Sequence, residues 1–157
     1  MDHRVTIVGA GPAGALLAWL LSSRGIETLL LERQSDFARE FRGEVLMPSG
    51  LRALDAAGVA LPDEALLPLS VFEGWMNGRP FVNVRLDGDG RETRPPTAIS
   101  QPKLLEQLVA MSEETGRFAL RRGTTVRRIE RTADGRATLH VRDAGGESTL
   151  DAGFLIG

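Results

Sequence analysis

Apolar residues near the start of the chain form two short runs with a helical pattern between them. The runs, residues 4–8 and 26–31, are nearly continuous, which is typical of parallel strands that are covered on both faces. The pattern between them predicts a helix from about Pro12 or Ala13 to Arg24. Its apolar positions are Leu16, Leu17, Leu20 and Leu21. This order of strand, helix and strand favours an α/β fold with a parallel sheet.

The middle of the chain has an antiparallel pattern. Residues 71–76 and 79–85 carry β-forming side chains on either side of Asn77-Gly78, the preferred residue pair of a type I′ turn. They predict a β-hairpin. Because antiparallel strands interrupt a βα pattern here, we assign residues 69–97 to a second, smaller β layer.

The rest of the chain predicts two more helices and several strands. The helices are expected at about residues 49–57 and from Gln101 to Gly116, and the second has an apolar stripe. That stripe consists of Leu104, Leu105, Leu108, Val109 and Met111. Further strands are predicted at residues 98–100, 118–121, 124–132, 137–142, 148–152 and 154–157. The three strands between residues 124 and 152 form an antiparallel meander, and the last strand is expected to be buried. The predicted fold class is α/β, with a Rossmann-like βαβ sheet, the meander and the smaller β layer.

A glycine fingerprint, Gly9-Ala10-Gly11-Pro12-Ala13-Gly14, connects the first strand to the first helix. Glycine clusters also serve ordinary turns, but this one has the strand before it and the helix after it that a dinucleotide-binding motif requires. Gly9 permits the tight turn, Gly11 leaves room for a pyrophosphate, and Gly14 lets the helix lie close to the sheet. The helix N-terminus favours phosphate.

Glu32 ends the second strand, 18 residues after Gly14. A carboxylate at about this spacing meets the ribose of an adenosine. It would repel a 2′-phosphate, so the site should accept the adenosine of FAD or NAD and not that of NADP. The chain therefore begins with a predicted ADP-binding βαβ unit.

Composition removes several other classes of function. The formal net charge of −2 gives no basic surplus for nucleic acid or an anionic membrane. The absence of cysteine excludes disulfides and thiolate metal sites, and it fits a reducing cytoplasm, where we expect the protein. The two histidines form no expected metal site. The apolar run at residues 13–21 is too short to span a bilayer.

An ordered set of motifs extends the fingerprint along nearly the whole chain. It comprises Gly9–Gly14, Leu31–Gln34, Arg42–Leu46 before a helix that ends at Gly58, the hairpin near Trp75, Ser100-Gln101 at a helix start, and Phe154–Gly157. In these motifs the sequence resembles the N-terminal half of the class A FAD-dependent monooxygenases, the aromatic hydroxylases typified by para-hydroxybenzoate hydroxylase. The resemblance implies that residues 1–68 and 98–157 form an FAD-binding domain, and residues 69–97 part of a substrate-binding β layer.

The resemblance also implies roles for single residues. Glu32 would bind the FAD ribose, and Arg33 would lie by the adenine. Arg42 would approach the pyrophosphate, where a planar guanidinium suits phosphate oxygens. Gln101 would contact the ribityl or phosphate region, and the Val126 backbone would meet the adenine. The expected cofactor-binding residues are Gly9, Gly11, Pro12, Ala13, Gly14, Glu32, Arg33, Arg42, Gln101 and Val126, with Trp75 on a substrate wall. Taken singly, Arg33, Arg42 or Gln101 would be an ordinary surface or helix-start residue, so their order along the chain carries the assignment.

The implied activity is that of an FAD-dependent monooxygenase. NADPH or NADH would reduce FAD, and O₂ would supply the oxygen transferred to an aromatic or similar electron-rich small molecule. Two alternatives remain open. A flavin halogenase or prenyl reductase would keep the fold, although the halogenase segment Trp-x-Trp-x-Ile-Pro is not found. An isolated nucleotide-binding module would bind without turnover.

The chain ends at Gly157, in the strand predicted for residues 154–157. In the resembled family, an Asp-Gly-containing segment follows this strand and binds the flavin's ribityl chain. We therefore expect a fragment of a longer protein, complete at the adenine end of its site, incomplete at the flavin end and not competent for turnover alone. The sequence leaves the substrate and the oligomeric state open.

Overall fold

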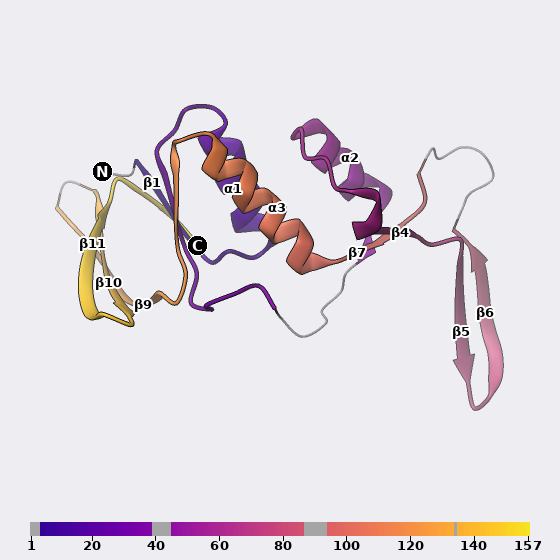
Figure 1. Ribbon diagram of the computed structural model, residues 1–157. Helices are drawn as coiled ribbons and strands as arrows, with labels where there is room; N and C mark the ends of the chain where they lie inside the picture. Colours follow the sequence, from indigo (N-terminus) through magenta and orange to yellow (C-terminus); the bar gives the residue numbers. More distant parts are fainter. Residues whose placement is uncertain (1–3, 39–44, 87–93, 134) are drawn as a thin grey trace. The chain divides into compact units, whose positions relative to one another are not determined.

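The computed structural model describes residues 4–38, 45–86, 94–133 and 135–157 (Figure 1). The chain divides into two compact units, one of Met1–Arg39 and Leu105–Gly157 and the other of Glu40–Leu104. Residues 45–68 belong to the second unit, and the domain boundaries expected from the sequence stay a prediction. The assignment of cofactor and substrate roles to the domains stays a prediction.

A four-stranded parallel sheet forms the centre of the first unit. Its strands are β1 (Val5–Val8), β2 (Thr28–Leu31), β8 (Phe118–Arg121) and β12 (Phe154–Ile156), in the order β12-β1-β2-β8. Val5 of β1 pairs with Thr28 on one side and with Phe154 on the other. The predicted parallel βαβ sheet is confirmed, and the carboxyl ends of β1 and β2 lie at the same edge of it.

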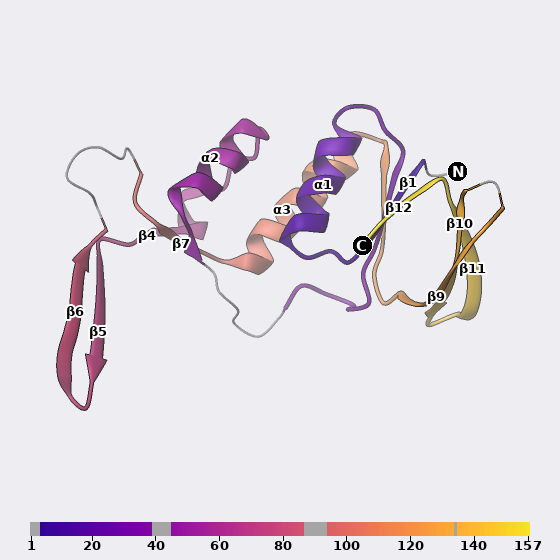
Figure 2. The same ribbon diagram turned by 180° about the vertical axis from the view of Figure 1, so that it is seen from behind.

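The sheet separates two layers of the first unit. One layer contains α1 (Pro12–Ser22) and the part of α3 (Gln101–Glu114) that belongs to this unit. The other layer is a meander of β9 (Thr125–Arg131), β10 (Ala137–Asp143) and β11 (Gly146–Ala152), as Figures 1 and 2 show from opposite sides.

The meander shares a buried apolar cluster with the sheet. Leu29 and Leu31 of β2 pack with Leu139, Val141 and Ala152 of the meander. Leu30, between the two leucines, projects to the opposite face because side chains alternate along a strand. The predicted antiparallel meander is confirmed, with the strand order β11-β10-β9.

Small side chains bring α1 close to the sheet. Its most deeply buried residues are Ala15, Ala18 and Ser22. The leucines predicted as its apolar face, Leu16, Leu17, Leu20 and Leu21, are only half-buried. Alanine and serine at the contact let the helix backbone approach the strands. In the described part of the chain, no helix combines the length and the apolarity needed to cross a membrane.

β12 is more exposed than its apolar sequence predicts. The expected buried strand has Phe154 62% exposed and Ile156 41% exposed. Among the described strands, β12 lies at the edge of the sheet and pairs with β1. Leu155 packs against the meander cluster, so its two neighbours project to the other face, which the described residues do not cover at this edge.

The second unit contains a small mixed region and a hairpin. The strands β3 (Val45–Leu46), β7 (Thr97–Ile99) and β4 (Leu66–Pro68) form one antiparallel sheet, accompanied by α2 (Pro48–Ala56) and the short helix η1 (Asp63–Ala65). The hairpin pairs β5 (Val71–Met76) with β6 (Arg79–Arg85). Its turn has positive φ at Asn77 (50°) and Gly78 (73°), as the predicted type I′ turn requires.

Candidate functional site

An open cavity of ≈ 370 Å³ lies at the carboxyl ends of β1 and β2. In open parallel sheets this edge is where ligands bind. The cavity is lined by Val8, Gly9, Gly11, Leu31, Glu32, Arg33, Thr124, Thr125 and Val126. It therefore brings together five residues that the sequence predicts for the cofactor site: Gly9, Gly11, Glu32, Arg33 and Val126.

The glycine turn forms the first wall. Gly9 has a backbone φ of +102°, which residues with a side chain rarely adopt. A Cβ added to Gly14 would lie 2.0 Å from the carbonyl oxygen of Gly9, so only glycine permits this contact between helix and turn. A Cβ at Gly11 would meet nothing within 4 Å. The turn at Gly9 and the close helix contact at Gly14 are those expected of the motif, and the pyrophosphate role of Gly11 stays a prediction.

Glu32 forms the second wall together with Arg33. Although charged, Glu32 is only 4% exposed. Its Oε2 accepts a hydrogen bond from the backbone N–H of Ala10 at 2.8 Å, and its Oε1 accepts one from the N–H of Gln34 at 2.9 Å. These donors compensate for the burial of the carboxylate. The side chain of Arg33 is exposed and always charged.

The third wall is the segment Thr124–Val126, where β9 begins. The N–H of Thr124 donates to the carbonyl oxygen of Glu32 at 2.8 Å, which attaches this wall to the second. Val126 is expected at the adenine, whereas Thr124 and Thr125 are lining residues that were not predicted from the sequence. Their position next to Val126 was the available signal, but a pair of threonines at a strand start has no distinctive pattern.

The remaining predicted site residues lie elsewhere. Pro12 and Ala13 form the first turn of α1, next to the cavity-lining Gly11. Gln101 is the first residue of α3 and, like Trp75 on β5, belongs to the second unit. Arg42 lies outside the described residues. The roles of these residues stay predictions.

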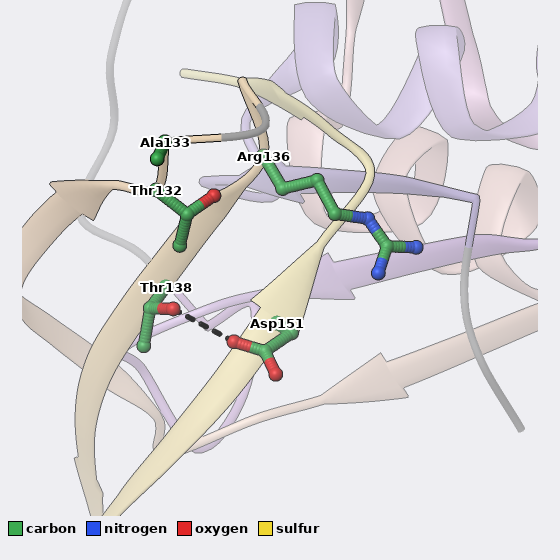
Figure 3. Close-up of a pocket in the computed structure, with 5 residues that line it drawn as sticks. All are labelled: Thr132, Ala133, Arg136, Thr138 and Asp151. Carbon is green, nitrogen blue, oxygen red and sulfur yellow. Dashed lines mark hydrogen bonds between the residues drawn. The ribbon is translucent and has the colours of Figure 1, made fainter.

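A second cavity, of ≈ 400 Å³, lies on the meander (Figure 3). It is lined by Thr132, Ala133, Arg136, Thr138 and Asp151. The Thr138 hydroxyl donates a hydrogen bond to Asp151 Oδ1 at 2.7 Å. None of these residues belongs to a predicted motif, and no glycine or helix terminus, which phosphate prefers, is among the described residues of the lining. The smaller cavity at the strand ends is therefore the better candidate.

The cavity at the strand ends fits the ADP part of a dinucleotide. Gly11 is open toward it, so the space that a side chain would fill is available to a pyrophosphate. α1 begins at the next residue, and its first amides and positive dipole end favour an anion. The Glu32 carboxylate, also on the lining, can accept bonds from ribose hydroxyls.

Comparison with known proteins gives the same assignment. The FAD binding domain family matches residues 2–157. The 6-methylpretetramide 4-monooxygenase of Streptomyces rimosus is 34% identical over 129 residues, which cover 78% of this chain and 30% of that protein. The p-hydroxybenzoate hydroxylase of Acinetobacter baylyi is 33% identical over 74% of this chain and 29% of its own length. The chain thus spans about a third of the length of these relatives.

Solved structures show the same fold. A p-nitrophenol 4-monooxygenase from Pseudomonas putida superimposes with a TM-score of 0.81 at 22% identity, over 98% of this chain and 40% of that one. Aklavinone-11 hydroxylase, solved with FAD and aklavinone, gives a TM-score of 0.80 at 26% identity, over 100% of this chain and 33% of that one. The chain belongs to the FAD binding domain family, and the resemblance of its motifs to the class A FAD-dependent aromatic monooxygenases is confirmed.

Proposed function

We propose that the cavity at the carboxyl ends of β1 and β2 binds the ADP moiety of FAD. The observation that carries this proposal is that Gly9, Gly11, Glu32 and Arg33 line one cavity beside the start of α1. Gly11 would admit the pyrophosphate, Glu32 would accept the ribose hydroxyls, and Arg33 with the backbone at Val126 would border the adenine.

In the whole protein we propose FAD-dependent monooxygenase activity on an aromatic or similar electron-rich small molecule, with O₂ as the oxygen source. When bound, FAD would supply the redox chemistry, and the residues of this chain would hold and orient it. The relatives named above are monooxygenases or hydroxylases, which favours this activity over halogenation, double-bond reduction or binding without turnover.

The reductant and the remaining contacts are further proposals. One relative is described as a probable NADH-specific resorcinol 4-hydroxylase, which supports a nicotinamide reductant without choosing between NADH and NADPH for this protein. Arg42 and Gln101 would contact the pyrophosphate and ribityl regions, and Trp75 would contact the substrate. The cysteine-free chain suits a reducing cytoplasm.

Titration of the chain with FAD, followed by flavin fluorescence, tests the binding proposal. We expect saturable binding at one site per chain and competition by ADP. A 2′-phosphorylated ADP should compete more weakly, because its added phosphate would face the Glu32 carboxylate. Failure of both FAD and ADP to bind would contradict the proposal. For the whole protein, substrate-stimulated NAD(P)H oxidation with an oxygenated product in mass spectra would separate hydroxylation from the alternatives.

A further inference from the structure

Glu32 forms hydrogen bonds to neighbouring segments through both its side chain and its backbone. The carboxylate accepts the N–H groups of Ala10 and Gln34, at 2.8 and 2.9 Å. The Glu32 N–H donates to the carbonyl oxygen of Arg121 at 2.9 Å, and the Glu32 carbonyl oxygen accepts the N–H of Thr124 at 2.8 Å. One residue therefore joins the glycine turn, its own loop, the end of β8 and the segment that leads into β9.

These connections reach all three walls of the cavity. Ala10 lies between Gly9 and Gly11 of the first wall, Gln34 follows the second wall, and Thr124 belongs to the third. The side-chain contact with Ala10 spans 22 positions in the sequence. Through this contact the buried carboxylate that follows β2 can orient the turn that follows β1.

We propose that Glu32 is a positioning residue that holds the glycine turn in its phosphate-binding shape, in addition to its contact with the ribose. This inference rests on the proposed ADP site. The two backbone N–H groups are accepted by different oxygens, Oε2 for Ala10 and Oε1 for Gln34. Hydrogen bonds from backbone N–H groups to a buried carboxylate are charge-assisted and strong enough to define the turn.

The variant Glu32→Gln separates the two roles. It keeps the size of the side chain but replaces one acceptor oxygen with an NH₂ group, which would face a backbone N–H donor. Glu27→Gln is the matched control, because Glu27 precedes the opposite end of β2 and pairs with Arg117 at the surface. Its replacement removes the same charge from the chain without altering the turn.

The affinities for ADP and 2′,3′-dideoxy-ADP distinguish the roles. If Glu32 orients the turn, Glu32→Gln should weaken dideoxy-ADP by roughly tenfold for one lost charge-assisted bond, and ADP by at least as much because its ribose contact is also altered. Glu27→Gln should leave both affinities unchanged. If Glu32 acted on the ribose alone, dideoxy-ADP would bind the variant and the wild type equally well, and this result would overturn the inference.

A measurement on the wild-type chain does not depend on the variant's folding. NMR should detect a scalar coupling across the hydrogen bond between the Ala10 amide nitrogen and the Glu32 carboxyl carbon in the ligand-free chain. Absence of that coupling would overturn the inference. If the wild type bound no ADP at all, the proposed function would fail, whereas the coupling would still report whether Glu32 holds the turn.

Discussion

The cavity at the strand ends and the β5–β6 hairpin represent opposite ways of using side chains. At the cavity, the charged Glu32 is only 4% exposed and its oxygens are bonded to the backbone. On the hairpin, the apolar Trp75 is 59% exposed. Other large apolar side chains exposed there are Val71, Phe72, Met76, Phe81 and Val84.

The two regions differ in whether the contacts that define their roles lie within the described residues. The polar groups that line the cavity bond to one another, so the described residues themselves define its shape and chemistry. A two-stranded hairpin is marginal by itself, and its exposed apolar side chains acquire a role only from what they contact. The proposed nucleotide site therefore rests on contacts within the described residues, whereas the proposed substrate wall at Trp75 depends on what its side chain contacts.

The largest effect on stability should come from Gly14→Ala, which would disrupt the contact between α1 and the glycine turn at the cavity. The added Cβ would overlap the carbonyl oxygen of Gly9, a backbone atom that cannot move without opening the turn. We expect the free energy of unfolding to fall by about 3 kcal/mol, the upper range for overpacking. Urea denaturation measures this change, and unaltered stability would contradict the tight contact between helix and turn.

Gly11→Ala should separate binding from folding in the same turn. Its Cβ would enter open space, and its φ of −71° suits any residue, so stability should be preserved. FAD affinity should fall by about 1–3 kcal/mol, because the methyl group takes space that the pyrophosphate needs. Fluorescence titration of this variant beside the wild type measures the loss. Equal affinities would remove Gly11 from the site.

The first region was predictable because its signals are local. The turn, α1 and β2 follow one another within about thirty residues, and α1 begins at Pro12 as predicted. The hairpin and its type I′ turn were predictable for the same reason, because both depend on residues that are adjacent in the sequence. The backbone donors to Glu32 could not be predicted, since they depend on how the turn after β1 lies against β2 in three dimensions.

The features that could not be predicted from the sequence depend on contacts between residues that are far apart along the chain. β3 and β4 are two and three residues long and pair with β7 at distant positions, too short to show any periodicity. The exposure of β12 reflects its place at the sheet edge, which an apolar sequence does not reveal. Thr124 and Thr125 line the cavity because of the path of the chain after β8.

Arg122→Ala should produce a smaller effect beside the cavity. Its guanidinium lies 4.2 Å from the ring centroid of the buried Phe37 and donates to both carboxylate oxygens of Glu106, at 3.2 and 2.8 Å. Phe37 lies in the loop that follows Glu32. We expect a loss of about 1 kcal/mol in unfolding free energy, because a cation–π contact and a surface ion pair each contribute little.

Glu106→Gln provides the control for Arg122, since it removes the ion pair and keeps the ring contact. Its effect should be about 0.5 kcal/mol or less, because Glu106 is largely exposed. Chemical denaturation of both variants compares the two contributions. Equal losses would show that the contact with Phe37 adds nothing.

Trp75→Ala should have the smallest effect on stability. It tests whether the β5–β6 hairpin, unlike the cavity at the strand ends, depends little on this side chain for its fold. Its exposed side chain has little buried area to lose, so the free energy of unfolding should change by less than about 0.5 kcal/mol. Thermal unfolding of the variant beside the wild type tests this. A large destabilisation would mean that the hairpin depends on this side chain for its own fold.

The most direct test of the proposed nucleotide site is an ADP titration of the isotope-labelled chain followed by NMR. We expect the largest amide shifts on the cavity walls, at Ala10, Gly11, Glu32, Thr125 and Val126. Shifts concentrated instead on Thr132, Arg136, Thr138 and Asp151, around the cavity of the meander, would contradict it.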